Sequence, residues 1–323
     1  SRFDEIFRSI DPKPLGSASL AQVHKAELVS GDVVAVKVQR PGVRAVMAQD
    51  IDVMRSVAKH ISRFMKDTQM LDLRDVVEEL WATFLEETDF MKEANNLQEF
   101  AELNKNVVFI SWPKPYLEYC TESVLVMEYI EGISIRDTKK LKEYGYDLDE
   151  IGLKVMDNYA TQILEHGFFH ADPHPGNLFV HEGKVVYLDL GIMGRLSVRE
   201  RMGFSKIIEA VGSQNASDLK DALISFSVEH DLAAIDHARL LAELDNVLKS
   251  YCATNVADID IGALLSDIMA LTRQCRVTLP SSVTAVSRGI VTMEGSLAEY
   301  LANTNMIEII NLSLIHISEP TRH

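Results

Sequence analysis

The chain has 323 residues, 47% of them hydrophobic and 25% charged, and its formal net charge is −16. This length and composition predict an ordinary folded protein of two lobes or domains. The acidic balance argues against a surface that binds nucleic acid non-specifically, because attraction to phosphates requires a basic face. Cys120, Cys252 and Cys275 are far apart and odd in number, which argues against a disulfide framework or a CxxC metal site and favours a reducing compartment.

The first residues, SRFDEIFRSID, alternate charged and apolar side chains and lack the apolar segment of a signal peptide. No run of 18 apolar residues occurs anywhere, so the sequence predicts no membrane-spanning helix. The chain does not begin with Met, and residues 311–323 follow a helical pattern that has no capping residues. We expect this last stretch to be a foreign or disordered tail.

A β-hairpin is predicted near the start of the chain. LAQVHKAEL and VVAVKVQ alternate like strands, and residues 30–32, Ser-Gly-Asp, form the turn between them. Residues 34–37, VAVK, match the V-A-I-K pattern in which a strand lysine reaches the phosphates of a nucleotide. A lysine in such a strand is more often a surface residue, but the hairpin before Lys37 and the loop after it favour a nucleotide-binding role.

Two helical stretches follow the hairpin, one between Asp50 and Lys66 and a longer one from Leu73 to Asn104. The residues expected on the buried side of the longer helix are Val76, Val77, Leu80, Phe84, Leu97 and Phe100. A phosphate-binding strand lysine pairs with a helix glutamate in kinases. Glu93 is the first candidate for this partner and Glu87 the second, although acidic residues on such helices are commonly solvated.

SVLVMEYIEG predicts a buried strand that leads into a loop, where a kinase changes from its small to its large lobe. Backbone groups at residues 127–129 are expected to receive the adenine. The next helix carries Ile151, Val155, Tyr159 and Ile163 on one side and ends at Gly167. From residue 198 to 310 the pattern is helical, with an interruption at Pro280.

The stretch HADPHPGN, residues 170–177, has two histidines at the i, i+4 spacing of helical zinc sites. Its two prolines are incompatible with that helix, so a zinc site is the minor interpretation. The stretch is instead predicted to be a loop that presents Asp172 and, five residues later, Asn177. The two histidines are expected to be structural, with His170 bracing the loop backbone and His174 near the mouth of the loop.

Two short strands, LFV and KVVYLDLG, follow this loop and are joined by a turn at residues 181–183. Asp172, Asn177 and Asp189 then occur in the same order as three functional residues of protein kinases. The distance of five residues from Asp172 to Asn177 is also the same. In protein kinases, an Asp orients the hydroxyl nucleophile, an Asn binds Mg²⁺, and an Asp before Gly binds the Mg²⁺ that bridges the phosphates. The alternative is a loop whose Asp and Asn only satisfy turn backbone groups.

Together with Lys37, these motifs predict an α+β, bilobal, protein-kinase-like fold. The expected small, β-rich N-lobe with helices spans residues 1–130, and the larger, mainly α-helical C-lobe spans residues 131–310. Residues 311–323 are the expected tail.

The motifs PLGSASLAQVH, ETDFMKEANN, HADPHPGNLF and YLDLGIMGRL occur in this order and resemble the UbiB family of atypical kinases. This family includes mitochondrial proteins that support coenzyme Q synthesis. The alanine- and serine-bearing first motif stands where an ordinary protein kinase has G-x-G-x-x-G. Gly16 occupies a position where the family often has alanine, and the K-x-G-Q motif of the family's N-terminal extension is not found among these residues.

The resemblance implies a role for each matching residue. The implied catalytic residues are Asp172, Lys37, the helix glutamate Glu93, and the E-x-D residues Glu87 and Asp89. The implied nucleotide-binding residues are Gly16, Ser17, Ala18, Ser19, Val23, Ala35, Lys37, Glu128 and Tyr129. The implied metal ligands are Asn177 and Asp189.

The resemblance also implies ATP and Mg²⁺ as cofactors, and ATPase or phosphotransferase activity rather than protein phosphorylation. It implies a role in isoprenoid quinone (ubiquinone-type) biosynthesis at a membrane. The implied partners are an isoprenoid lipid or quinone precursor, an anionic membrane surface and other quinone-synthesis proteins, without nucleic acid. The implied location is cytoplasmic and peripheral to a bacterial inner membrane, or the matrix side of an organelle.

Two other functions stay open. A small-molecule phosphotransferase of the aminoglycoside or choline kinase kind also has a His, an Asp and an Asn near this spacing, but PLGSASLAQVH and the E-x-D stretch argue against it. A nucleotide-gated scaffold would bind ATP and a partner without turnover. The presence of every polar group that the chemistry needs argues against the scaffold.

Overall fold

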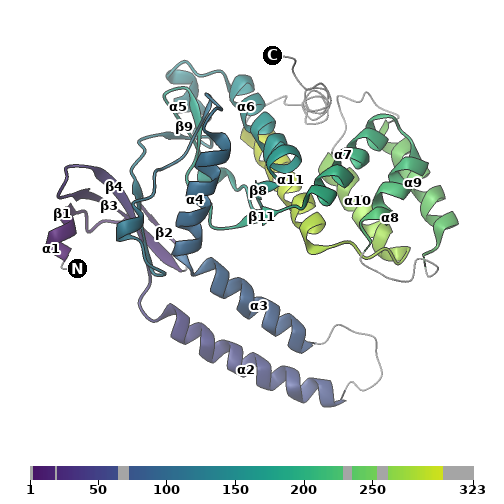
Figure 1. Cartoon of the computed structure of the whole chain (residues 1–323), viewed down its shortest axis with the longest axis horizontal. Coiled ribbons are helices and arrows are strands. Elements are labelled where there is room, and N and C mark those ends of the chain that lie inside the picture. Colours follow the sequence, from purple (N-terminus) through teal and green to yellow (C-terminus); the bar gives the residue numbers. More distant parts are fainter. Residues whose placement is uncertain (1–2, 19, 65–72, 228–234, 253–260, 301–323) are drawn as a thin grey trace. The chain divides into compact units, whose positions relative to one another are not determined.

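The computed structural model describes residues 3–18, 20–64, 73–227, 235–252 and 261–300 (Figure 1). The chain divides into two compact units. The first unit comprises Ser1–Glu102, Trp112–Glu131 and Asp189–Gly191, and the second comprises Leu103–Ser111, Gly132–Leu188 and Ile192–His323. The expected tail at residues 311–323, and Ser19 of the expected phosphate loop, lie outside the described residues.

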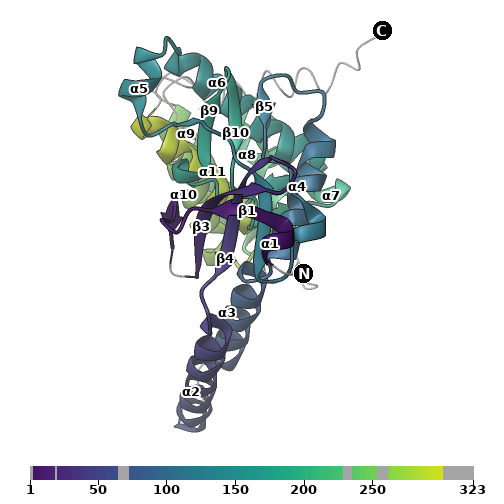
Figure 2. The same ribbon diagram turned by 90° about the vertical axis from the view of Figure 1, so that its left-hand side faces the viewer.

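An antiparallel sheet with the strand order β1-β3-β4-β6 organises the first unit, and β2 also pairs with β3 (Figure 2). Its strands are β1 (Phe7–Ile10), β2 (Gly16–Ser17), β3 (Ala21–Leu28), β4 (Val33–Gln39) and β6 (Val124–Glu128). β3 and β4 are the predicted hairpin, and Gly31 in its turn has a φ of 96°, which favours glycine. Because side chains alternate along a strand, Val34 and Val36 enter the hydrophobic core while Ala35 and Lys37 lie on the opposite face.

The helices of the first unit are α1 (Phe3–Ile6), α2 (Val43–Phe64), α3 (Leu73–Glu87), α4 (Phe90–Asn104) and the 3₁₀ turn η1 (Leu117–Tyr119). Helices α2 and α3 form an antiparallel pair that extends away from the sheet of the same unit (Figures 1 and 2). A small hydrophobic core of their own, with Ile51, Ala58 and Val77 at its centre, joins the two helices. These three side chains are at most 7% exposed.

The single helix predicted from Leu73 to Asn104 is wrong, because the chain breaks between α3 and α4. The hydroxyl of Thr88 donates a hydrogen bond to the carbonyl of Phe84, at 2.8 Å, which is a local bond that competes with helix continuation. The prediction that Leu80 is buried is also wrong, since Leu80 is 53% exposed. The inner side of α3 consists instead of Val77 and Phe84, which are each 7% exposed.

The second unit contains a sheet with the order β5-β10-β9-β7 and a separate pair formed by β11 and β8. Its strands are β5 (Ile110–Ser111), β7 (Ile133–Ser134), β8 (Phe168–His170), β9 (Leu178–His181), β10 (Lys184–Tyr187) and β11 (Met193–Arg195). Strands β9 and β10 are the second predicted hairpin, and its turn has positive φ at Glu182 and Gly183. Asp189 follows β10 in sequence, as expected, and belongs to the first unit.

Helices make up most of the rest of the second unit. They are α5 (Thr138–Glu143), α6 (Leu148–Thr161), the π turn Gln162–His166, the 3₁₀ turn Pro175–Asn177, α7 (Val198–Gly212), α8 (Ala216–Ser225), α9 (His237–Cys252), α10 (Ile261–Gln274) and α11 (Ser281–Tyr300). The predicted inner side of α6 is buried, and the chain leaves the helical segment at Gly167, whose φ is 63°. Within the described residues, no helix has the length and apolar character needed to cross a membrane.

Candidate functional site

Lys37 lies between two carboxylates of the first unit. Its Nζ is 2.8 Å from Oε2 of Glu93 and 2.9 Å from Oδ2 of Asp189. The Glu93 side chain is 3% exposed, that of Lys37 is 16% exposed and that of Asp189 is 36% exposed. The predicted ion pair between Lys37 and Glu93 is therefore confirmed. The second candidate, Glu87, is exposed at the end of α3.

The start of α4 places Glu93 beside the strand lysine. Asp89 precedes the helix and accepts a hydrogen bond from the backbone N–H of Met91 at 3.1 Å, which is the geometry of an N-cap. Glu93 then falls in the first turn, and the ring of Phe90 lies 5.2 Å from Nζ of Lys37. Asp89, the second of the two E-x-D residues, thus caps α4. The described ion pairs of Lys37 involve neither Asp89 nor Glu87.

Helix α4 also holds the segment that carries Asp189. One turn after Glu93, the side-chain amide of Asn96 donates a hydrogen bond to the carbonyl of Leu190 at 2.8 Å. The N–H of Gly191 donates to Oδ1 of Asp189 at 2.9 Å. Asn96 was missed in the sequence, although its position three residues after Glu93 places it on the same helical face. The Asp-Leu-Gly segment is therefore attached both to β4, through Lys37, and to α4.

Burial and charge shift the ionisation of this cluster. Burial raises the pKa of Glu93 to about 7, and the neighbouring charge of Asp189 acts in the same direction, while Lys37 opposes both. Burial lowers the pKa of Lys37, but the charges and hydrogen bonds of Glu93 and Asp189 outweigh burial and raise it above its usual value. Lys37 therefore remains a cation whose position is fixed by two anionic partners.

The expected phosphate loop is held by a residue that the sequence did not reveal. Nε of Arg40 donates to the carbonyl of Ala18 at 2.9 Å, and Nη2 of Arg40 donates to Oγ of Ser17 at 2.7 Å. The N–H of Ala18 also donates to the carbonyl of Ala21 at 2.9 Å. A Cβ atom added at Gly16 would meet nothing within 4 Å, so an alanine would find room at this position.

The other expected nucleotide contacts lie along the sheet of the first unit. Val23 is paired with Lys37 in the β3–β4 register, so Val23, Ala35 and Lys37 share one face. The backbone N–H of Glu128 donates to the carbonyl of Lys114 at 2.8 Å, and that of Tyr129 donates to the carbonyl of Val33 at 3.2 Å. An adenine acceptor at either N–H would have to displace a protein carbonyl.

The HADPHPGN loop lies in the second unit and is held mainly through its backbone. The N–H of Asp172 donates to Nδ1 of His170 at 3.3 Å, and the carbonyl of Asp172 accepts from the N–H of His174 at 2.8 Å. Asn177 ends the short 3₁₀ turn, and its carbonyl accepts from the N–H of Leu188 at 2.9 Å. The Asp172 side chain is exposed, so its carboxylate is presented to solvent rather than used to hold the loop.

His174 supports the same loop from its surface. Its Nδ1 accepts a hydrogen bond from the N–H of Gly176 at 3.2 Å and another from Nη2 of Arg136 at 3.0 Å. His170 thus makes the expected hydrogen bond to the loop backbone, and His174 makes a backbone hydrogen bond as well. In the part of the chain that the structure describes, no group of three or more His, Cys, Asp or Glu side chains is arranged to hold a metal ion.

A chain of buried amides supports the start of this loop. Asn158 donates to Oδ1 of Asn104 at 2.7 Å, Gln162 donates to Oδ1 of Asn158 at 2.8 Å, and Oε1 of Gln162 accepts from the N–H of His170 at 3.0 Å. The hydroxyl of Tyr159 donates to the carbonyl of His170 at 2.9 Å. None of the three amide side chains is more than 1% exposed. The sequence signal for this network is the pair Asn158 and Gln162, four residues apart on one helical face.

Replacing Gln162 by leucine is expected to lower the free energy of unfolding by about 2 to 5 kcal/mol, because it leaves the N–H of His170 and the Oδ1 of Asn158 buried without their partner. Urea unfolding followed by circular dichroism measures this change. The matched control is Gln98→Leu, at an exposed position of α4, which should change stability by less than about 0.5 kcal/mol. Equal effects of the two substitutions would contradict the supporting role of Gln162.

Comparison with known proteins identifies similar chains. Residues 1–223 match the family model of the ABC1 atypical kinase-like domain. The chain is 36% identical over 298 residues to an uncharacterized aarF domain-containing protein kinase from Arabidopsis thaliana chloroplasts, covering 90% of this chain and 41% of that protein. It is 29% identical over 304 residues to a probable protein kinase UbiB of Azotobacter vinelandii, covering 91% and 56%. The chain thus spans about half the length of these curated relatives.

A solved structure is similar over almost the whole chain. It is a Mycobacterium tuberculosis protein in complex with erythromycin, with a TM-score of 0.73 and 21% sequence identity, and the match covers 99% of this chain and 81% of that one. At this identity the likeness shows the fold alone. Together with the family match, it confirms the predicted α+β, kinase-like fold.

Proposed function

Because this chain belongs to the ABC1 atypical kinase-like family, whose members include proteins named UbiB, we propose that it binds Mg-ATP and hydrolyses it slowly or transfers its phosphoryl group to a small molecule. The observation that carries the proposal is the position of Lys37 between Glu93 and Asp189, at 2.8 and 2.9 Å. A strand lysine paired with a helix glutamate is the arrangement with which kinases bind nucleotide phosphates.

The proposed roles follow the kinase arrangement. Lys37 contacts the nucleotide phosphates, and Glu93 fixes the position of its ammonium group. Asp172 orients the attacking hydroxyl or water. Its exposed carboxylate and its backbone-held loop support this assignment. The face with Val23 and Ala35 receives the adenine ring, and the loop from Gly16 to Ser19 covers the phosphates.

Asp189 and Asn177 are the proposed ligands of Mg²⁺, which neutralises developing charge on the phosphates when it is bound. Mg²⁺ usually keeps several waters and takes only one or two protein carboxylates together with substrate phosphates. Asp189 would supply one carboxylate and Asn177 one amide oxygen, which are oxygen ligands of the kind that this ion takes. Asp189 also suits the role, because its side chain is 36% exposed, its Oδ1 accepts from the N–H of Gly191, and its segment is attached to α4 at the carbonyl of Leu190.

Asp189→Asn is expected to weaken Mg-ATP binding by at least tenfold, because the substitution removes one negative charge from a divalent-ion site. The measurement is calorimetric titration with ATP at several Mg²⁺ concentrations. Metal-free ATP should bind the variant at least as well as it binds the native protein, because the Asp189 carboxylate of the native protein repels the phosphates.

The matched control for this experiment is Asp32→Asn, in the β3–β4 turn, where the exposed carboxylate accepts a hydrogen bond from Ser30. Native-like Mg-ATP affinity in a folded Asp189→Asn protein would refute the metal role. ADP release measured beside nucleotide affinity separates an enzyme from a nucleotide-gated scaffold.

The proposed setting is isoprenoid quinone biosynthesis at a membrane surface. The name of the Azotobacter relative, probable protein kinase UbiB, supports a kinase-type activity. Val46, Val53 and Val57 of α2 are each more than half exposed and follow a helical spacing, which supports contact with an apolar surface. The proposed partners are an isoprenoid lipid or a quinone precursor, an anionic membrane surface and other quinone-synthesis proteins.

A further inference from the structure

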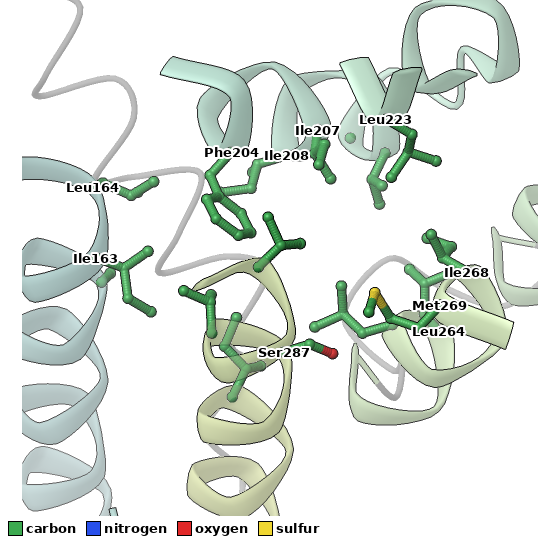
Figure 3. A pocket seen from close by; sticks show the side chains of 17 residues that line it. Ile163, Leu164, Phe204, Ile207, Ile208, Leu223, Leu264, Ile268, Met269 and Ser287 are labelled. Atoms are coloured by element: carbon green, nitrogen blue, oxygen red, sulfur yellow. The ribbon is translucent and has the colours of Figure 1, made fainter. Parts of the chain in front are cut away.

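A partly open cavity of about 100 Å³ lies among helices of the second unit (Figure 3). Its walls come from the end of α6 with the π turn that follows it, and from α7, α8, α10 and α11. Seventeen residues line the space, and Figure 3 shows carbon atoms of their side chains around it. Among these side chains, only the hydroxyl of Ser287 and the thioether of Met269 are not hydrocarbon.

The sequence keeps this space open by placing small residues in its walls. Ala160 of α6, Gly212 of α7 and Ser287 of α11 stand among lining residues that are otherwise mostly leucine, isoleucine and valine. Protein interiors normally pack at the density of organic crystals and leave few voids larger than a water molecule. A larger side chain at Ala160 or Ser287 would occupy part of the space.

The lining determines the class of molecule that the cavity can accept. A buried water needs two to four polar partners, and the cavity wall offers only the hydroxyl of Ser287. A charged or strongly polar group would lose its hydration without compensation. An engineered apolar cavity of about 150 Å³ in another protein stays dry and binds benzene. We propose that this cavity is a binding site for an uncharged hydrocarbon group, either an aromatic ring or the end of an alkyl or isoprenoid chain.

The cavity wall and the support of the HADPHPGN loop belong to the same helical segments. Ala160 and Ile163 line the cavity, whereas the adjacent Tyr159 and Gln162 make hydrogen bonds to the backbone of His170. On α11, a Cβ atom at Gly289 would lie 2.1 Å from the hydroxyl of Tyr159 and 3.3 Å from the carbonyl of His170. A ligand in the cavity therefore contacts the helical segments whose other side holds the loop that carries Asp172.

Binding is tested directly, without reference to ATP, so its failure is distinguishable from failure of the proposed enzymatic function. The probes are toluene as a ring, 1-octanol as an alkyl chain and geraniol as an isoprenoid chain, with benzoate as a charged ring. At a tenfold excess over its Kd, a bound hydrocarbon should raise Tm by about 3 °C. Benzoate should leave Tm unchanged. At one common probe concentration, the hydrocarbon that gives the largest shift binds most tightly, and it identifies the kind of hydrocarbon group that the cavity takes.

Two cavity-filling variants locate the site. Ser287→Leu and Ala160→Leu should each reduce the ligand-induced Tm shift to less than a third of the native value, whereas Ser287→Ala, which removes the hydroxyl and leaves the space open, should retain it. In the liganded native protein, amide exchange at residues 170–172 should slow by at least twofold. If one of the two filling variants does not fold, the Tm shift of the other is sufficient for the test. No Tm shift with any hydrocarbon, or an undiminished shift in a folded filling variant, would overturn the proposal.

Discussion

Lys37→Met is expected to weaken ATP binding by about 10- to 100-fold, the loss of one charge-assisted contact to a phosphate. It should also lower the free energy of unfolding by about 3 kcal/mol, because Glu93 and Asp189 are left side by side without their counter-charge and Glu93 is only 3% exposed. Fluorescent-nucleotide titration measures the first quantity, and urea unfolding measures the second.

A double substitution separates these two effects. In Lys37→Met with Glu93→Gln, the repulsion between the two carboxylates is removed, so most of the lost stability should return while ATP binding stays weak. The control is Arg8→Met, which removes a surface ion pair with Glu27 in the same unit and should cost less than about 1 kcal/mol. Nucleotide affinity that recovers together with stability would show that Lys37 acts only on the fold.

Asp172→Asn is expected to reduce the rate of ADP release by about 10²- to 10⁴-fold, which is the usual contribution of a positioned general base. Mg-ATP affinity and thermal stability should stay within about twofold and 2 °C of the native values. The structural reason is that the loop is held by the backbone of Asp172 and by His170, while the carboxylate is exposed. Asp149→Asn, at an exposed position in the first turn of α6, is the control.

The same assay tests whether protein is the phosphate acceptor. Purified protein is incubated with labelled Mg-ATP, anionic liposomes and a generic protein substrate, and both ADP and labelled phosphoprotein are followed. No A-P-E signature follows DLGIMGRL in the sequence, so we expect ADP release, stimulated by liposomes, without stoichiometric labelling of protein. Labelling that is abolished by Asp172→Asn and is insensitive to liposomes would contradict this expectation.

Features set by local sequence were predictable. The β3–β4 and β9–β10 hairpins follow from strand alternation and from glycine in the turns, and the structure has both. The ion pair of Lys37 with Glu93 was also predictable, because the kinase arrangement requires one helix glutamate and few candidates were present. The roles of these residues in catalysis stay predictions.

Features set by contacts between distant residues were not predictable. Helical periodicity continues through Thr88, yet the helix ends there, and the side chains of Gln39 and Arg44 donate to its carbonyl from elsewhere in the sequence. Arg40 and the phosphate loop are separated by more than 20 residues, and Asn104 and Asn158 by 54. Sequence patterns report which face of an element is buried, but not which side chain will meet it.

The α2–α3 pair has its own hydrophobic core, and its junction with α4 is fixed at the carbonyl of Thr88 by Gln39 and Arg44. Mutations in the core between its two helices therefore act on packing within the pair, whereas Arg44 of α2 acts on the junction and Glu93 lies beyond it. We expect that matched helical turns could be removed from or added to the far ends of α2 and α3 without moving the glutamate that Lys37 requires. Changes of length or of surface residues in the α2–α3 pair are thus expected to leave the contact between Lys37 and Glu93 in place.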